Sequence, residues 1–170
     1  MKSNDKILIL DFGSQYTQLI ARRVREIGVF SEVKPSSIST EEIIKINPSG
    51  IVLSGGPETV TISSSQKVHK SLLKSKIPIL GICYGMQTIA NELGGSVVKS
   101  DIREFGHAEI SHVNHSILFD NVSFDSDSLD VWMSHGDKVE VVPENFEIIA
   151  SSKDCKVAGF QNSDSNIFGL

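Results

Sequence analysis

The stretch Ile77-Pro-Ile-Leu-Gly-Ile-Cys-Tyr-Gly85 decides the fold class of this chain. Its first six residues are mostly apolar, and apolar residues at helical spacing follow over residues 86–93, up to the pair Gly94-Gly95. This pattern predicts a buried strand over residues 77–82, a sharp turn at Cys83, and a helix that ends at the two glycines. A strand that runs directly into a helix is the repeating unit of parallel α/β sheets.

The same alternation of strand and helix occurs upstream of this stretch. Apolar runs predict strands over residues 6–10, 29–34 and 50–54. Helical spacing and capping residues predict helices over residues 15–27, 40–46 and 65–74, and Thr40 is expected to cap the second of them. We therefore expect an α/β fold with a doubly wound, mostly parallel, flavodoxin-like sheet that is flanked by helices.

The pattern changes after Gly95. Short apolar segments separated by turn residues occur over residues 108–113, 130–133, 146–151 and 157–160. Such segments are typical of antiparallel strands joined by turns. The second half is therefore expected to be a mixed or antiparallel part of the fold. A single domain is predicted, because 170 residues lie close to the usual size of one.

Charge and hydropathy argue against several classes of protein. Sixteen basic residues against 21 acidic ones give a net charge of −5, which lacks the basic surface of a nucleic-acid-binding protein. The apolar runs are far shorter than the roughly 18 residues of a membrane-spanning helix, and no secretory signal is recognisable. We expect a cytoplasmic location without a membrane partner. The two cysteines have no C-x-x-C spacing, so neither a disulfide framework nor a metal site is predicted.

Cys83 is the leading candidate for a catalytic residue. It lies between Gly81 and Gly85 after a predicted strand, which is the pattern of a nucleophile elbow with cysteine at its centre. Such a turn strains its central residue and leaves no room for a β-carbon on either side. The following helix is expected to lower the thiol pKa and to offer N–H groups to an oxyanion. The alternative is an inert buried cysteine, which the two glycines disfavour. Cys155 lacks such glycines and is interpreted as an incidental thiol.

Two further loops follow predicted strands, at the sheet edge where ligands bind in this architecture. In Ser54-Gly-Gly-Pro57, Gly56 could donate an N–H group close to the thiol, although an ordinary glycine turn is the alternative. In Asp11-Phe-Gly-Ser-Gln-Tyr-Thr17, small and hydroxyl residues could hold a phosphate at a helix N-terminus. The chain would then be a flavodoxin-like nucleotide-binding module. Because this loop contains only Gly13, a packing turn is the favoured interpretation.

No histidine is an obvious general base for the thiol. Surface positions are favoured for His69, His112 and His115. His135 lies in Val131-Trp-Met-Ser-His-Gly-Asp137, where we expect a strand to end in a polar turn with a hydroxyl, an imidazole and a carboxylate. A substrate-binding loop is a more plausible role for this turn than a base.

Five stretches together resemble one protein family. They are Asp11-Phe-Gly-Ser-Gln-Tyr-Thr-Gln-Leu-Ile-Ala-Arg-Arg-Val-Arg25, Leu53-Ser-Gly-Gly-Pro57, Gly81-Ile-Cys-Tyr-Gly-Met-Gln87, Arg103-Glu-Phe-Gly106 and Trp132-Met-Ser-His-Gly-Asp137. On these stretches, residues 1–170 resemble a class I glutamine amidotransferase domain. The Gly-Ile-Cys-x-Gly elbow is common to the whole class, whereas the first and last stretches are similar to its GMP synthetase branch.

The resemblance implies that the side-chain amide of glutamine is hydrolysed, with Cys83 as nucleophile and a glutamyl thioester as intermediate. Ammonia is then the useful product. By position, Gly56 and Tyr84 would supply the N–H groups of an oxyanion hole, and a tetrahedral oxyanion also needs two such donors on physical grounds. The residues implied to bind glutamine are Gln87, Ser134, His135 and Asp137.

The resemblance also predicts what lies outside this chain. In the family, a strand similar to residues 167–170 continues into Gln-Phe-His-Pro-Glu, whose His and Glu complete a Cys-His-Glu triad. This chain ends before that segment, so we expect a C-terminally truncated domain that is inactive or weakly active alone.

The synthetase half of the family's reaction aminates XMP to GMP in a separate ATP-pyrophosphatase domain with a Ser-Gly-Gly-Val-Asp-Ser loop, which is absent here. That domain or subunit is the expected partner and would hold ATP and Mg²⁺, so no cofactor is expected in this chain. The full-length enzyme is expected to be a homodimer. The alternative is a non-catalytic, regulatory protein with the same fold.

Overall fold

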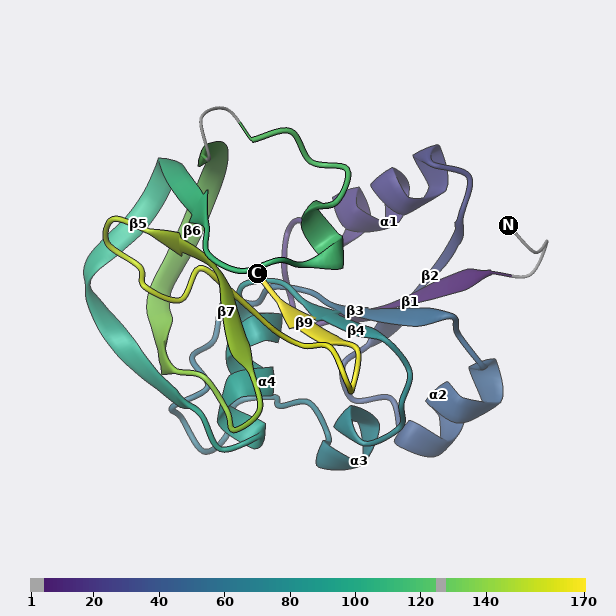
Figure 1. Cartoon of the computed structure of the whole chain (residues 1–170). Coiled ribbons are helices and arrows are strands. Elements are labelled where there is room, and N and C mark those ends of the chain that lie inside the picture. The colour runs from purple at the N-terminus through teal and green to yellow at the C-terminus, as the bar shows by residue number, and fades with distance from the viewer. Residues whose placement is uncertain (1–4, 125–127) are drawn as a thin grey trace.

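The computed structural model describes residues 5–124 and 128–170, and the side chains of residues 101–105 and 134–135 lie outside that description. The described strands form one sheet with the order β2-β1-β3-β4-β9-β8-β7-β5-β6. The parallel half consists of β1 (Lys6–Asp11), β2 (Phe30–Pro35), β3 (Gly50–Leu53), β4 (Ile79–Gly81) and β9 (Ile167–Gly169). The predicted doubly wound parallel sheet is therefore confirmed (Figure 1).

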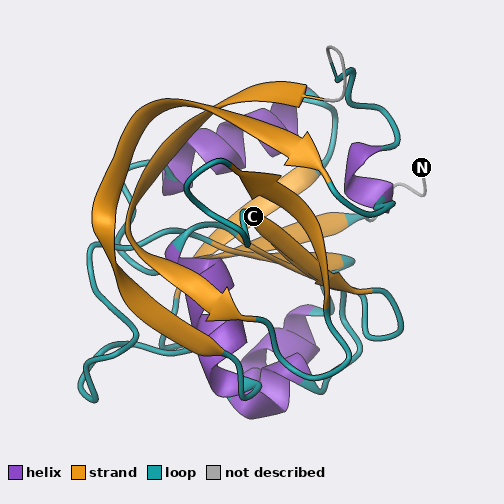
Figure 2. Cartoon of the chain, turned by 60° about the vertical axis from the view of Figure 1, so that its left-hand side comes forward, coloured by secondary structure: helices purple, strands orange, loops and turns teal. Residues whose placement is uncertain are grey.

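The other strands pair antiparallel, as the change of pattern after Gly95 predicts. They are β5 (Ser96–His112), β6 (Ser128–Val141), β7 (Glu147–Ser152) and β8 (Gly159–Asn162). β8 pairs with β9, so the antiparallel half continues the parallel half as one mixed sheet. Figure 2 shows β5 and β6 as a long, curved pair of strands that arches over one end of the molecule.

Helices cover both faces of the parallel half (Figure 1). α1 (Thr17–Glu26) lies on one face, and α2 (Thr40–Ile46), α3 (Lys70–Leu73) and α4 (Tyr84–Glu92) lie on the other. None of the helices in the described part of the chain is long and apolar enough to cross a membrane.

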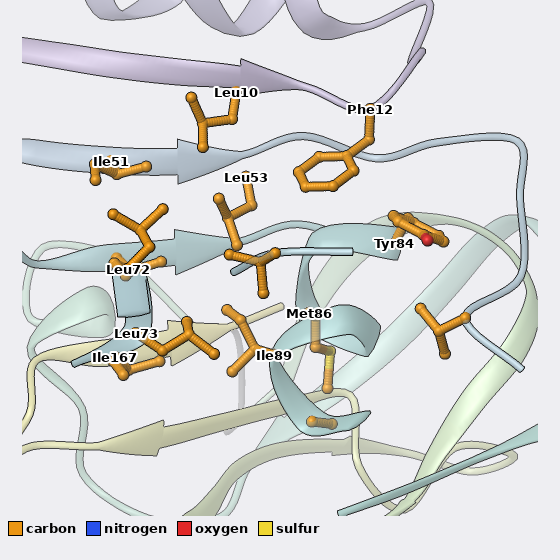
Figure 3. Close-up of a cluster of buried hydrophobic side chains, with 14 of the residues drawn as sticks. Leu10, Phe12, Ile51, Leu53, Leu72, Leu73, Tyr84, Met86, Ile89 and Ile167 are labelled. Carbon is orange, nitrogen blue, oxygen red and sulfur yellow. The ribbon is translucent and has the colours of Figure 1, made fainter. Parts of the chain in front are cut away.

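Alternate residues of β1 pack into two separate apolar layers. Leu8 and Leu10 belong to the larger buried cluster, part of which Figure 3 shows around Leu53 and Ile89. Ile9 points the other way and packs in a smaller cluster with Ala21 of α1. Each fully buried aliphatic side chain of this kind stabilises the fold by about 1.5–3 kcal/mol. The strands and α4 therefore form a rigid base for the loops at the carboxyl edge of the sheet.

One predicted helix cap is wrong by one residue. Ser39, not Thr40, caps α2, because the Ser39 backbone is extended and its hydroxyl accepts a hydrogen bond from the Glu42 N–H. The Glu42 side chain in turn accepts from the Ser39 N–H, which completes a capping box.

The helix predicted over residues 65–74 is much shorter, since α3 begins only at Lys70. The backbone just before it hydrogen-bonds to α4 instead of to itself. The Val68 N–H donates to Thr88 Oγ1 at 3.0 Å, and the Tyr84 hydroxyl donates to the Gln66 carbonyl oxygen. These tertiary contacts outweigh the local helical pattern.

The polar turn predicted at the end of the stretch from Val131 to Asp137 is also wrong. These residues lie inside β6, where His135 is the backbone partner of Glu104 and Ser134 that of Phe105. The strand continues because β5 is long enough to pair with it on both sides of this point.

Candidate active site

Cys83 occupies a strained turn between β4 and α4. Its backbone has φ 51° and ψ −109°, a region that non-glycine residues rarely adopt. A β-carbon at Gly81 would lie 2.6 Å from the carbonyl of Gly85, and one at Gly85 would lie 2.8 Å from the Leu53 carbonyl carbon. The two glycines are therefore required by the close approach of α4 to β3 and β4. The predicted nucleophile elbow is confirmed in its geometry.

Hydrogen bonds join the elbow to β9, the last strand along the chain. The Cys83 N–H donates to the Leu170 carbonyl oxygen at 2.8 Å, and the Leu170 N–H donates to the Gly81 carbonyl oxygen at 2.9 Å. Because β9 runs parallel to β4, its carboxyl end lies directly beside the thiol.

Burial raises the pKa of the Cys83 thiol above its ordinary value. The shift is opposite to the one expected from the N-terminus of α4, because loss of hydration penalises the charged thiolate. The thiol at rest is therefore protonated at neutral pH, and a proton acceptor must act on it before or during attack.

The raised pKa predicts a measurable pH dependence. We expect the rate of Cys83 alkylation by iodoacetamide to reach half its maximum at a higher pH in the folded chain than in the same chain unfolded in urea. The folded state also holds this proton more tightly than the unfolded state, so the thiol contribution to the free energy of unfolding falls as pH rises through the ordinary thiol pKa. Site-resolved mass spectrometry measures the rate of Cys83 alkylation in the folded chain and in the unfolded chain. A half-maximum on the acidic side of the unfolded value would contradict the prediction.

The two proposed oxyanion donors lie near Cys83 in the fold. Tyr84 is the first residue of α4, and Gly56 lies in the loop after β3, where both Gly56 and Cys83 line the same groove. A β-carbon on the neighbouring Gly55 would lie 3.7 Å from the Cys83 β-carbon. Neither the Gly56 N–H nor the Tyr84 N–H has a hydrogen-bond acceptor among the residues that the structure describes. Both groups are therefore free to bind an oxyanion.

Gln87 and Asp137, which the family resemblance implies as glutamine-binding residues, contact each other. The Gln87 side chain is buried and its Nε2 donates to the Asp137 carbonyl oxygen at 2.9 Å. Both residues and Cys83 line an inner cavity of about 370 Å³ whose other walls are largely apolar. The predicted glutamine-binding side chains of Ser134 and His135 lie outside the described residues, although their backbone runs in β6 beside this cavity.

Cys83 lines two hollows of the molecule. A wider groove of about 780 Å³ lies between the loops after β1 and β3, and Ile82, Cys83 and Trp132 line both this groove and the inner cavity. Trp132 is 75% exposed although it is a large aromatic residue. The sequence motif contains Trp132 but does not indicate a role for it. Only the folded structure shows that Trp132 lies at the site.

The histidines described by the structure lie away from Cys83. His69, His112 and His115 are exposed, as predicted, and His107 is exposed and paired with Asp130 at 2.9 Å. None of these four lines the inner cavity or the groove. The thiol therefore lacks a histidine base among the side chains described.

The loop after β1 is a closed packing turn, in agreement with the interpretation that its sequence favours. Asp11 Oδ1 accepts hydrogen bonds from the Gly13 N–H at 2.9 Å and from the Thr17 hydroxyl at 2.7 Å, and Ser14 Oγ accepts from the Tyr16 N–H. The Asp11 carboxylate therefore accepts the hydrogen bonds that the Gly13 N–H and the Thr17 hydroxyl could otherwise offer to a phosphate.

Cys155 is buried, and its Sγ lies 3.3 Å from the Val157 carbonyl oxygen. Among the described residues, no group of three or more His, Cys, Asp or Glu side chains is arranged to hold a metal ion.

The family model described as glutamine amidotransferase class-I matches residues 8–170. The chain belongs to this family. A GMP synthase [glutamine-hydrolyzing] of Ruthia magnifica subsp. Calyptogena magnifica is 53% identical over 167 residues, which are 98% of this chain and 32% of that protein. The corresponding enzyme of Pseudomonas entomophila is 51% identical, with coverages of 97% and 32%. The chain thus spans about a third of the length of these amidotransferase relatives.

Solved structures of amidotransferases have the same fold. A protein from Thermoplasma acidophilum that is named as a candidate GMP synthase subunit superposes with a TM-score of 0.83 at 32% identity, over 98% of this chain and 82% of that one. A glutamine amidotransferase of Thermotoga maritima gives a TM-score of 0.73 at 22% identity, over 98% and 74% of the two chains. The second likeness supports the amidotransferase fold alone.

Proposed function

We propose that this domain is the glutamine amidotransferase part of a GMP synthase and hydrolyses glutamine to glutamate and ammonia. The observation that carries the proposal is the elbow itself: Cys83 has a strained backbone at the start of α4 and lines a groove with Gly56, and the N–H groups of Gly56 and Tyr84 have no acceptor among the described residues. A nucleophile that lines a groove together with unpaired N–H donors is the arrangement needed for acyl transfer. Relatives that are about 50% identical carry the name GMP synthase [glutamine-hydrolyzing].

The reaction proceeds through two tetrahedral steps. The Cys83 sulfur attacks the side-chain carbonyl carbon of glutamine, and the carbonyl electron pair moves onto oxygen, where the Gly56 and Tyr84 N–H groups stabilise it. The C–N bond then breaks, and the nitrogen leaves as ammonia with the proton that the thiol gave up. Water next adds to the thioester, releases glutamate and restores the thiol. Each donor is worth about 2.7–4 kcal/mol of transition-state stabilisation.

The glutamine side chain fits the inner cavity in this proposal. Gln87 holds the β6 backbone at Asp137, and both residues line the cavity, so this part of the cavity wall has a fixed position. Ser134, His135 and Asp137 would bind the amino-acid end of glutamine.

The ammonia is used by a partner. We propose an ATP-pyrophosphatase domain or subunit that binds ATP and Mg²⁺ and aminates XMP to GMP, within a homodimeric cytoplasmic enzyme. The matched relatives are about three times as long as this chain, which leaves room for such a domain in them.

Glutamate release from glutamine tests the proposed function. We expect a weak rate or none from residues 1–170, because no described histidine lines the cavities at Cys83. A chain extended after Leu170 through Gln-Phe-His-Pro-Glu should be active, since the carboxyl end of β9 delivers the added histidine beside the thiol. Absence of glutamate release from the extended chain, with or without the synthetase partner, would refute the proposal.

A further inference from the structure

Ser54 is a buried hydroxyl residue to which the proposed reaction assigns no role. It follows β3 directly and its exposed fraction is 0%. Its Oγ accepts a hydrogen bond from the Phe12 N–H at 3.0 Å and donates one to the Gly55 carbonyl oxygen at 2.9 Å. The hydroxyl therefore links the end of β1 to the first peptide group of the Gly55-Gly56 loop.

The hydrogen bond from Ser54 to the Gly55 carbonyl oxygen fixes the orientation of the whole peptide unit between Gly55 and Gly56. The C=O of Gly55 and the N–H of Gly56 belong to the same planar peptide unit and point in opposite directions. A donor that holds the carbonyl oxygen therefore also determines where the Gly56 N–H points. That N–H is one of the two donors proposed to stabilise the oxyanion.

A peptide between two glycines is unusually free to rotate. Neither Gly55 nor Gly56 has a side chain that restricts its backbone, so such a peptide can flip at little steric cost. The Phe12 backbone limits the space on one side of Gly56, because a β-carbon there would lie 2.6 Å from the Phe12 carbonyl oxygen. The Ser54 hydroxyl is the only described side-chain group that hydrogen-bonds to this peptide unit.

We propose that Ser54 is a positioning residue for the oxyanion hole, which it completes by holding the Gly55–Gly56 peptide with the Gly56 N–H turned toward the carbonyl oxygen of glutamine. The inference rests on the proposed function, since it assumes that Cys83 attacks a glutamine carbonyl group. Ser54 itself does not touch the substrate. It acts through its hydrogen bond to the Gly55–Gly56 peptide group.

Alkylation of Cys83 in the 170-residue chain tests the inference without requiring turnover. The probe is a glutamine analogue with a chloromethyl ketone in place of the side-chain amide. The sulfur forms a bond to the probe, chloride leaves, and the ketone oxygen gains negative charge during the attack. Iodoacetamide is the reference, because its iodide is displaced at a saturated carbon and no oxyanion forms there. The ratio of the two rate constants at Cys83, resolved by mass spectrometry, reports on the oxyanion hole alone.

Ser54→Val and Ser54→Thr form the informative pair, because valine and threonine have the same shape and differ in the hydroxyl group. We expect the maximal rate of ketone alkylation to fall by about tenfold or more in Ser54→Val, with half-saturation and the iodoacetamide rate unchanged. Ser54→Thr should regain most of the lost rate. Ser31→Ala is the matched control: Ser31 is equally buried and donates to the Ala21 carbonyl oxygen at 2.9 Å, but it lies on β2. It should keep the wild-type ratio.

The outcomes separate the two proposals. Equal ratios for wild type and Ser54→Val, or an equal loss in Ser54→Val and Ser54→Thr, would overturn the role of Ser54 and leave the glutaminase proposal intact. If the ketone does not label wild-type Cys83 in preference to Cys155, or if glutamine gives no protection, the glutaminase proposal itself fails. A parallel fall in both alkylation rates in Ser54→Val would show a general disturbance of the thiol and would also overturn the inference.

Discussion

Cys83→Ala is expected to lower the rate of glutamine hydrolysis by at least about 10⁴-fold in a chain extended through Gln-Phe-His-Pro-Glu. Loss of a catalytic nucleophile has an effect of this size or larger in well-studied hydrolases, because the remaining site binds substrate but cannot form the covalent intermediate. Glutamate release measured at saturating glutamine gives the ratio. Glutamine binding should persist, since the proposed oxyanion donors are backbone N–H groups that the substitution keeps.

Cys155→Ala is the matched control for this experiment. Cys155 is the other cysteine of the chain and is buried. Its Sγ lies 3.3 Å from the Val157 carbonyl oxygen, and the residue lines the same inner cavity as Cys83. We expect this variant to retain at least half of the wild-type rate. Comparable losses in the two variants would contradict the assignment of Cys83 as nucleophile.

Gly85→Ala is expected to reduce the free energy of unfolding by about 4 kcal/mol or more, which would leave little folded protein. The added methyl group would overlap the Leu53 backbone, because its carbon would lie 2.8 Å from the carbonyl carbon and closer still to the oxygen. Neither group can move away easily. Leu53 is held in the centre of the sheet between β1 and β4, and α4 is packed by fully buried side chains such as Ile89. Urea denaturation followed by circular dichroism measures the loss.

Gly136→Ala provides the comparison for that substitution. Gly136 lies in β6, has no positive φ, and a β-carbon there would meet nothing within 4 Å. We expect its free energy of unfolding to stay equal to that of the wild type or to rise by up to about 1 kcal/mol, because alanine restricts the unfolded chain. A Gly85→Ala variant as stable as Gly136→Ala would show that α4 can move away from β3.

Much of the fold could be predicted because its signals are local. Residues 77–85 specify strand, turn and helix within nine positions, and the pattern of β1, apolar over four consecutive residues, indicates burial on both faces. The errors arise where distant residues compete with the local pattern. Residues 65–69 are not helical, and α4 supplies the hydrogen-bond partners of the Val68 N–H and the Gln66 carbonyl oxygen. The segment before Asp137 stays in a strand because β5 pairs with it.

The candidate site could be predicted to a similar extent. Cys83 and Gly56 follow from glycine positions at strand ends, which are properties of the sequence. The sign of the thiol pKa shift depends on how much of Cys83 the surrounding chain buries, and sequence alone does not contain that quantity. The hydrogen bond from Gln87 to Asp137 joins residues 50 positions apart, so it becomes visible only when the sheet is assembled.

The hydrogen bond between Leu170 and Cys83 bears on how the protein should be produced. Any residues attached after Leu170 emerge at the mouth of the site, because that residue is already bonded to the nucleophile's own amide. An affinity tag placed there would be delivered to the thiol as a competitor for substrate. A tag placed ahead of Lys6 enters the sheet at the opposite edge, since β1 and β4 run in the same direction as β3 between them. Purification handles therefore belong at the amino end.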